Sequence, residues 1–390
     1  MSSLSRFQEL RFVLTVVVLV CLLGSTSACS KTEPYDPPDL FYYFASYPVG
    51  KNPTAVIAGD VNHDSFTDVI TTNIGSDTLS ILLGNGDGTF QDQMQLHVCQ
   101  EPRSLAMHDF NHDDHLDVAL ACSGGDEVEI LLGRGNGKFE EGPHYPVYRT
   151  PVSLVSEDVN GDHHPDLVVA LRNDKVKVFL GKGTGEFRLG PQYEYGDTPT
   201  SVALADLNED GKLDLIVTNG GAMSHGVAVW VGNGDGSFRD PKDYPAGKRS
   251  LGVSLADFNS DGHTDLLVIN GEKDSFTALL GNGDATFQSG KDAGANAGPN
   301  FGLARDFNGD HIEDVAIVNL QSSDLSIIFG KGNGTFHYPP RHYKTKRSPF
   351  AVATFPATMS GIEEPGFVIA DNGSASVSIF LHRGLKQSAR

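Results

Sequence analysis

The chain has 390 residues and a formal net charge of −21, with 50 Asp and Glu residues against 29 Lys and Arg. An acidic balance of this size excludes a general electrostatic attraction to nucleic acid. The length would suit two or three ordinary domains, but a repeat that runs through most of the chain favours one large domain.

Residues 1–28 are predicted to be a signal peptide. Two arginines precede an apolar run over residues 12–23, which is short for a membrane span and has the length of a signal-peptide core. Small residues and then Cys29 follow, an order that resembles a bacterial lipoprotein signal. The resemblance implies that Cys29 carries the lipid, which would anchor an extracytoplasmic protein to a membrane. Secretion after Ala28 and an uncleaved anchor are the alternatives.

A short tether follows the lipidated cysteine. Residues 29–39 contain three prolines, which favour an extended chain. The repeat domain is expected over residues 40–384, and residues 385–390 form a C-terminal tail.

An acidic loop with the pattern D-x-N-x-D-x-x-x-D recurs six times, about every 49 residues. Carboxylates at positions 1, 5 and 9 and an amide at position 3 are the oxygen ligands that Ca²⁺ prefers. A polar turn alone would not need four oxygen-bearing residues at the same offsets in every copy. We therefore expect about six Ca²⁺ ions, one in each loop. The predicted ligands are Asp60, Asn62, Asp64, Asp68, Asp109, Asn111, Asp113, Asp117, Asp158, Asn160, Asp162, Asp166, Asp206, Asn208, Asp210, Asp214, Asp257, Asn259, Asp261, Asp265, Asp306, Asn308, Asp310 and Asp314.

Short β-strands are predicted around each loop. One apolar run follows the loop, and after a polar connection a second run ends in a Gly-rich turn and a Phe, as in residues 81–90. Runs of this length that are rich in β-branched residues and bounded by Gly, Asn and Asp are typical of strands. With one more strand between each Phe and the next loop, every repeat holds four strands, which is one blade of a β-propeller.

The two ends of the chain are predicted to share the last blade. Phe41 and Pro53 repeat the spacing that separates a Phe from a Pro in four later repeats, but no earlier strand of their own blade precedes them. Residues 350–381 supply three strands and then stop. The N-terminal strand would therefore complete an all-β, seven-bladed propeller of four-stranded antiparallel blades and leave no open edge. Phe355 stands where a seventh loop would begin, so six metal sites are expected and not seven.

These motifs and their period resemble the FG-GAP/VCBS-type repeat, the family that includes the seven-bladed integrin α-subunit head. The resemblance covers residues 40–384. It implies Ca²⁺ loops with a structural role on one face of the ring and partners on the opposite face. The Gly that is usual at loop position 6 is replaced in four loops, where a left-handed backbone is expected and sites one, three and six would be weaker. The residues at that position are Ser65, Asp114, His163, Gly211, Gly262 and His311.

Other conspicuous residues have alternative interpretations. Cys99 and Cys122 lie on strands that flank the second loop, and they either form a disulfide or remain thiols. Seven of the 14 His lie in the loops, where transition-metal binding or pH sensing is conceivable, but no paired spacing between blades is evident and solvated positions are favoured. Trp230 aligns with apolar strand residues of the other repeats, so we expect it in the core and not at a sugar site.

Function specific to this chain is expected where the repeats differ, on the face opposite the loops. Ligand-binding candidates there are Arg149, His225, Lys248, Arg249 and Arg347. The leading hypothesis is a monomeric, non-enzymatic binding or scaffold propeller that recognises an unidentified extracellular protein or glycan. The alternative is a carbohydrate-active enzyme, similar to a polysaccharide lyase, or a lectin on the same scaffold. No acid, base and nucleophile set stands out from the repeat, which argues against the enzyme.

Overall fold

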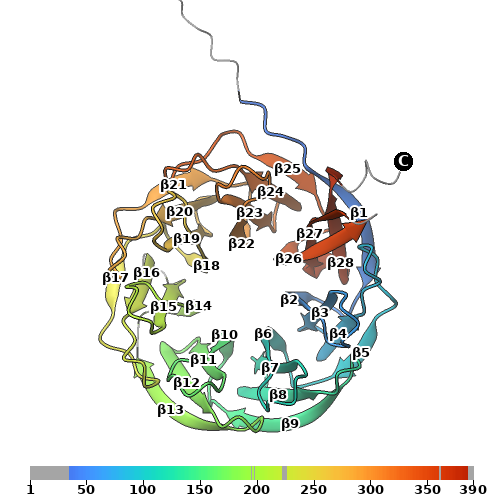
Figure 1. The fold of residues 1–390 in the computed structure, drawn as a ribbon, viewed down its shortest axis with the longest axis vertical. Coiled ribbons are helices and arrows are strands. Elements are labelled where there is room, and N and C mark those ends of the chain that lie inside the picture. Colours follow the sequence, from blue (N-terminus) through green and yellow to red (C-terminus); the bar gives the residue numbers. More distant parts are fainter. Residues whose placement is uncertain (1–34, 195, 197, 222–225, 360–361, 385–390) are drawn as a thin grey trace, which may run out of the picture. The chain divides into compact units, whose positions relative to one another are not determined.

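The computed structural model describes residues 35–194, 196, 198–221, 226–359 and 362–384. The predicted signal segment, Cys29, His225 and the tail 385–390 lie outside this part of the chain. Within the unit Pro37–Arg390, the described residues form seven four-stranded antiparallel sheets arranged in a ring (Figure 1). The predicted all-β, seven-bladed propeller is confirmed.

Six blades follow one another along the chain, each with its strands in sequence order across the sheet. Blade 1 is β2 (Pro53–Gly59), β3 (Asp68–Asn73), β4 (Thr78–Leu82) and β5 (Met94–His97), and blade 2 is β6 (Pro102–His108), β7 (Asp117–Cys122), β8 (Glu127–Gly133) and β9 (Phe139–Pro146). Blade 3 is β10 (Pro151–Glu157), β11 (Asp166–Leu171), β12 (Lys175–Gly181) and β13 (Phe187–Glu194), and blade 4 is β14 (Pro199–Ala205), β15 (Asp214–Asn219), β16 (Gly226–Trp230) and β17 (Lys242–Tyr244). Blade 5 is β18 (Ser250–Ala256), β19 (Asp265–Asn270), β20 (Ser275–Leu279) and β21 (Lys291–Gly294), and blade 6 is β22 (Pro299–Arg305), β23 (Asp314–Asn319), β24 (Asp324–Ile328) and β25 (Arg341–Lys344).

Blade 7 joins the two ends of the propeller. It contains β26 (Pro349–Met359), β27 (Ile362–Asp371), β28 (Ser376–His382) and, as its outer strand, β1 (Phe41–Pro48). Strand β1 runs antiparallel to β28, from the pair Phe41 and His382 to the pair Pro48 and Ser376. The predicted closure by the N-terminal strand is therefore confirmed, and Figure 1 shows β1 beside β28 at the rim.

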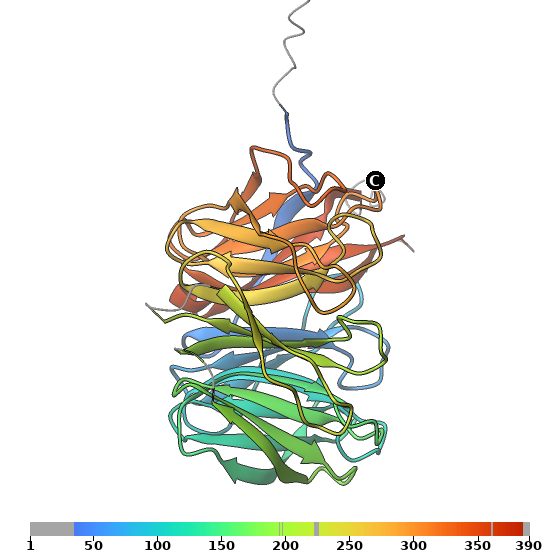
Figure 2. The same ribbon diagram turned by 90° about the vertical axis from the view of Figure 1, so that its left-hand side faces the viewer.

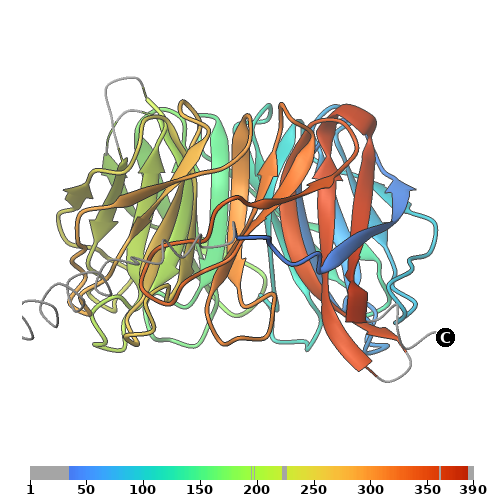
Figure 3. The same cartoon turned by 90° about the horizontal axis from the view of Figure 1, so that it is seen from above.

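A long β-hairpin replaces the acidic loop in blade 7. Strands β26 and β27 remain paired through Phe355 with Gly366 and on to Met359 with Ile362, and the hairpin extends past the neighbouring turns (Figure 3). Phe355 is 2% exposed, and its ring lies 5.7 Å from that of Phe90 in blade 1. An apolar side chain that packs against the next blade thus stands where the first Asp of a loop would be.

The second and third strands of each blade form the core because both of their faces are covered by neighbouring blades. All six residues of β3, and their equivalents in β7, β11, β15, β19 and β23, are buried. Trp230 on β16 is 1% exposed and packs in one cluster with residues of blades 3 and 4, including Val178 and Val202. The prediction that Trp230 belongs to the core is confirmed. In the described part of the chain, no helix is long and apolar enough to cross a membrane.

Tyrosines on the outer strands fasten neighbouring blades. The hydroxyl of Tyr145 in blade 2 accepts the backbone N–H of Phe187 in blade 3 at 2.7 Å, and the two rings meet edge to face. Tyr47 makes the same pair of contacts with Phe90 across the closure of the ring. The Phe that ends each Gly-rich turn therefore takes part in blade-to-blade packing. Figure 2 shows the ribbons of the blades from the side.

Candidate functional site

The six acidic loops join the first strand of a blade to its second strand. In the fourth loop, Asp206 accepts the N–H of Asp210 at 3.1 Å through Oδ1 and the N–H of Gly211 at 2.8 Å through Oδ2. The amide oxygen of Asn208 accepts the Asp210 N–H as well, at 3.0 Å. Oxygens at positions 1 and 3 are thus turned toward the inside of the loop. The same bonds recur in the loops that begin at Asp60, Asp109, Asp257 and Asp306.

The carboxylate at position 9 has a structural task of its own. Asp214 is fully buried; its Oδ1 accepts the N–H of Gly232 at 2.8 Å, and its Oδ2 accepts the N–H of Leu207 at 3.0 Å. It therefore ties the start of the loop to the Gly-rich turn of the same blade. Burial raises the pKa of Asp214 and of its equivalents, to about 7 for Asp314. Equivalent bonds are made by Asp68, Asp117, Asp166, Asp265 and Asp314.

The donor set of these loops fits the predicted Ca²⁺. Carboxylate and amide oxygens are the ligands of a hard cation, and an oxygen that accepts one N–H bond keeps a further lone pair. In the described structure the loops do not gather three carboxylates within 4.8 Å of one another; the group that meets this distance is Cys99, Cys122 and Glu129. Ligation by all three carboxylates would therefore require side chains to shift on binding.

Left-handed backbone occurs at two positions of every loop. At position 6, φ is 67° for Ser65, 65° for His163 and 67° for His311, so the expected conformation is confirmed for non-Gly residues. Position 4 also has positive φ, for example 60° at His63 and 59° at His112. These values are uncommon for residues with a Cβ. The first Asp of the loop stabilises this backbone by accepting the N–H groups of positions 5 and 6.

Histidines of neighbouring loops form pairs, which corrects the interpretation that no paired spacing recurs between blades. Nε2 of His63 lies 2.8 Å from Nδ1 of His115, and Nε2 of His112 lies 2.7 Å from Nδ1 of His164. Each pair joins position 4 of one loop to position 7 of the next. Both pairs have a sequence separation of 52, slightly longer than the repeat, and this recurrence was the signal that could have revealed them.

Cys99 and Cys122 form a disulfide, with their Cα atoms 5.8 Å apart. Cys99 lies in the segment that leads into β6, and Cys122 ends β7 opposite Pro102. The buried Glu129 accepts the N–H of Cys99 at 2.7 Å, and burial raises the pKa of this carboxyl. The disulfide therefore attaches the segment that leads into blade 2 to the second strand of that blade.

The basic residues predicted to form a binding patch lie in separate connections. Arg149 precedes β10, Lys248 and Arg249 precede β18, and Arg347 precedes β26. These connections enter blades 3, 5 and 7, which are not neighbours in the ring (Figure 1). Arg347 donates to the carbonyl of Gly373 at 2.9 Å, and Lys248 lies 3.9 Å from a Glu272 carboxylate oxygen. The described members of the predicted patch are thus spread around the rim.

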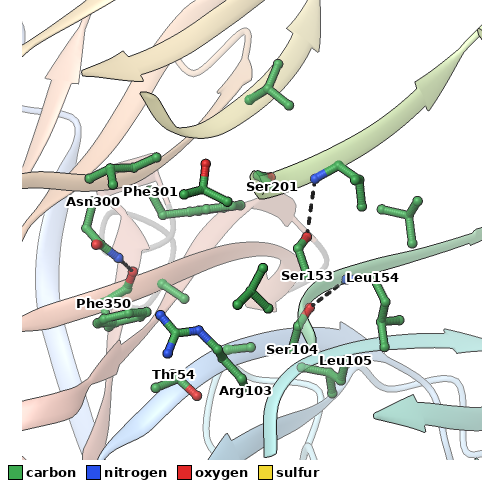
Figure 4. Close-up of a pocket in the computed structure, with 18 of the residues that line it drawn as sticks. Thr54, Arg103, Ser104, Leu105, Ser153, Leu154, Ser201, Asn300, Phe301 and Phe350 are labelled. Carbon is green, nitrogen blue, oxygen red and sulfur yellow. Dashed lines mark hydrogen bonds between the residues drawn. The ribbon is translucent and has the colours of Figure 1, made fainter. Parts of the chain in front are cut away.

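A cavity of about 430 Å³ lies at the end of the central channel away from the acidic loops. It is lined by the beginnings of the first strands, such as Arg103 to Leu105 of β6 and Ser153 to Val155 of β10. Two lining hydroxyls accept N–H bonds from the next blade: Ser104 from Leu154 and Ser153 from Val202, each at 3.3 Å (Figure 4). The cavity is therefore built jointly by the blades.

Arg103 is the charged member of the ring of seven residues at the second position of the first strands. Its side chain extends across the cavity toward Phe350 of blade 7 (Figure 4). Arg172, which follows β11 in blade 3, also lines the cavity. Burial, together with the charge of Arg172, lowers the pKa of Arg103, and the charge of Glu101 acts in the opposite direction. The other six residues at this position are Thr54, Val152, Thr200, Leu251, Asn300 and Phe350.

A family model of the FG-GAP-like repeat matches four overlapping segments of the sequence, residues 60–120, 109–169, 158–217 and 215–268. Together they span more than half of the chain. The protein belongs to the FG-GAP-like repeat family. No curated protein sequence matches this FG-GAP chain.

Several solved structures share the fold of this FG-GAP propeller. BBS1N, solved in complex with ARL6DN, aligns with a TM-score of 0.62 at 10% identity, covering 87% of this chain and 96% of its own. A streptogramin B lyase aligns with a TM-score of 0.59 at 13% identity, covering 88% and 98%. An Agrocybe aegerita lectin specific for non-reducing terminal N-acetylglucosamine aligns with a TM-score of 0.51 at 19% identity, covering 76% of this chain and 81% of its own. At these identities the likeness concerns the fold alone.

Two features of this FG-GAP propeller were missed by sequence reasoning. Arg103 escaped because it lies within a strand and not in a divergent connection, although it is the one charged residue at its repeat position. The histidine pairs escaped because their members belong to different repeats. Comparing each repeat position across all seven blades would have singled out the first of these features.

Proposed function

We propose that this FG-GAP propeller is a calcium-stabilised, extracytoplasmic binding protein. It would take an anionic group of a protein or glycan into the cavity at the channel mouth, on the face opposite the acidic loops. The observation that carries the proposal is the half-buried Arg103 in that cavity, which Arg172 from the next blade also lines.

The charges around the cavity favour an anion. Within the part of the chain that the structure describes, neither Arg103 nor Arg172 forms an ion pair within 4.0 Å. Glu101, whose charge acts on Arg103, accepts a hydrogen bond from the Ser123 hydroxyl at 3.2 Å. Two guanidinium groups that face a cavity without a bonded carboxylate form a site for a planar anion, which Arg binds with paired N–H donors. Such a site is unusual on a chain with a net charge of −21.

The cavity also explains why one ligand group would be selected. Most of its wall is apolar or carries hydroxyls, as at Leu105, Ser104 and Phe301. Concave sites of this kind bury a small group and fix its orientation with a few polar contacts. A carboxylate or sulfate on a glycan, or an acidic peptide side chain, would fit this chemistry.

Calcium would have a structural role on the other face. The ions would be held by the carboxylate and amide oxygens at positions 1, 3, 5 and 9 of the loops, such as Asp206, Asn208, Asp210 and Asp214. Bound Ca²⁺ would neutralise carboxylates that repel one another within each loop. The disulfide between Cys99 and Cys122 suits the extracytoplasmic location that the leader and Cys29 predict, since disulfides persist in oxidising compartments.

The test compares binding to an array of acidic and neutral glycans, and to a panel of acidic peptides, in millimolar Ca²⁺. Arg103→Gln and Arg172→Gln are each expected to weaken binding of the acidic probes about 10- to 100-fold, as for the loss of a charge-assisted hydrogen bond. The matched variant Lys248→Gln removes a charge from the same face but outside the cavity, and it should bind like the wild type.

Each other outcome separates the proposal from its alternatives. Loss of binding in Lys248→Gln with intact binding in Arg103→Gln would place recognition on the rim. Equal binding of neutral and acidic glycans would favour a lectin without an anion site. If unsaturated sugars are released from an acidic polysaccharide, as measured by absorbance, the protein would be an enzyme.

A further inference from the structure

We propose that the two interblade histidine pairs, His63 with His115 and His112 with His164, each bind a transition-metal ion such as Zn²⁺, Cu²⁺ or Ni²⁺. These sites would lie on the face that carries the acidic loops. They would be distinct from the oxygen-lined loops and from the cavity at the other end of the channel.

The two pairs have the same geometry although they share no residue. The facing ring nitrogens are 2.8 Å apart in the first pair and 2.7 Å apart in the second. The ring centroids are 4.9 Å apart in both, with interplanar angles of 55° and 52°. In each, Nε2 of the earlier His faces Nδ1 of the later one. An arrangement produced twice by the repeat is a property of the loop geometry and not of one flexible side chain.

The fold fixes both partners of each pair. His63 and His112 occupy loop position 4, where φ is positive, and their rings face the histidines of the next blade. The rings of His115 and His164 lie over Gly135 and Gly183 in the Gly-rich turns of their own blades. A Cβ on either glycine would come within 2.4–2.5 Å of ring atoms, so these turns leave room for an imidazole.

Imidazole pairs at this distance are suited to borderline metals. Neutral His nitrogens are preferred ligands of Zn²⁺, Cu²⁺ and Ni²⁺, whereas Ca²⁺ prefers oxygen. A Zn–N bond is about 2.0–2.1 Å, which places two nitrogens of a tetrahedral site about 3.3 Å apart. The rings would need to separate by only about half an ångström, and their partial exposure allows this. Water would fill the remaining positions, as in open zinc sites.

The other loops provide an internal comparison. Glu209 and His263 occupy positions 4 and 7 of loops 4 and 5, with Oε1 and Nδ1 2.8 Å apart, so the same contact is made there by a carboxylate and an imidazole. The corresponding residues of loops 3 and 4 are Gly161 and Lys212, which offer no pair of metal ligands. Two imidazole pairs therefore arise from the described loops, which predicts two ions bound through paired histidines.

The experiment is a Zn²⁺ titration of the full chain in millimolar Ca²⁺, with bound zinc measured after gel filtration. His63→Asn and His112→Asn are each expected to remove one Zn²⁺ per chain, and the double variant should lose two. Asn is used because it tolerates the left-handed backbone of position 4. His311→Asn is the matched control, since His311 is an exposed loop His with positive φ, and it should leave the zinc content unchanged.

The coordination is checked with Cu²⁺ in place of Zn²⁺. Electron paramagnetic resonance of the wild type should show nitrogen hyperfine coupling that disappears in the double variant. Absence of zinc retention, or unchanged zinc in the double variant, would overturn the proposal. Zinc that is displaced by raising Ca²⁺ and is insensitive to the His substitutions would assign the metal to the acidic loops and would also overturn it.

Discussion

Asp371 at the end of the second strand of blade 7 lies at the position that Asn319 occupies in blade 6, since each ends a strand opposite the first Pro of its blade. Asn319 donates to the Ser326 hydroxyl at 2.8 Å, whereas Asp371 accepts from the Ser378 hydroxyl at 2.5 Å. Asn is also found there in blades 1, 4 and 5. Blade 7 thus has a buried carboxyl where most blades have an amide.

This difference predicts a pH effect on stability. Burial raises the pKa of Asp371 to about 7. The hydrogen bond from Ser378 and the charge of Lys346 lower this pKa, but their effects are smaller. A carboxyl whose pKa is raised on folding contributes stability below its unfolded value of about 3.9, and this contribution is lost as the pH rises through about 7. Asp371→Asn should therefore gain stability relative to the wild type as the pH rises. The difference in unfolding free energy between variant and wild type should be roughly 2–3 kcal/mol larger at pH 8 than at pH 5.

Urea unfolding of both proteins at the two pH values measures this difference. Other titrating groups are common to both proteins, so they cancel in the comparison. A stability difference that is the same at pH 5 and pH 8 would contradict the prediction.

Removing calcium is expected to lower the melting temperature. Extracellular Ca²⁺ modules often bind at about 10⁻⁴–10⁻³ M, so 1 mM Ca²⁺ would stabilise the fold by about 0.4–1.4 kcal/mol for each occupied loop. A thermal melt with and without EDTA measures the sum over the loops. Mg²⁺ at the same concentration is the control, because it demands a smaller octahedral site. Equal melting in Ca²⁺, Mg²⁺ and EDTA would contradict the assignment of these loops to calcium.

Two substitutions in the fourth loop should separate metal binding from its structural role. Asp210 is exposed at position 5, so Asp210→Ala should reduce stability in Ca²⁺ but have little effect in EDTA. Asp214 is also a predicted ligand, but it is fully buried and accepts two N–H bonds, so Asp214→Ala should cost about 2–4 kcal/mol even in EDTA because it leaves two buried donors unpaired. Unfolding free energies in both buffers provide the comparison, and equal stability of the two variants in EDTA would refute it.

The repeat allowed the fold to be predicted because its information is local. Spacing placed each strand, and the isolated segment from Phe41 to Pro53 predicted that the ring closes through the N-terminal strand. The substitution of Phe355 for a loop Asp likewise indicated that blade 7 lacks the acidic loop.

Features that depend on contacts between blades could not be predicted in the same way. The pair of His63 and His115 depends on how far one blade is rotated from the next. The role of position 9 depends on the Gly-rich turn folding back over the loop, as Gly232 does over Asp214. The rim candidates Arg149 and Arg347 were grouped by charge, whereas the ring places them on separated blades.

The disulfide of blade 2 replaces a contact that blade 1 makes with Gly and Asn. Gly50 lies over Asn73, with a Cβ on Gly50 only 2.6 Å from the Asn73 side chain, and Cys99 and Cys122 occupy the equivalent positions. Cross-linking residues 23 apart stabilises a fold by about 3 kcal/mol through the unfolded chain. Reduction should therefore lower the melting temperature of the wild type.

The double variant Cys99→Gly/Cys122→Asn tests whether the Gly and Asn contact can replace the disulfide. Its melting temperature should be insensitive to reductant and should lie between those of the oxidised and the reduced wild type. The amide of residue 122 can donate to the buried Glu129, which holds the position of Ser80 in blade 1. A double variant that melts below the reduced wild type would show that the Gly and Asn contact cannot be transferred between blades.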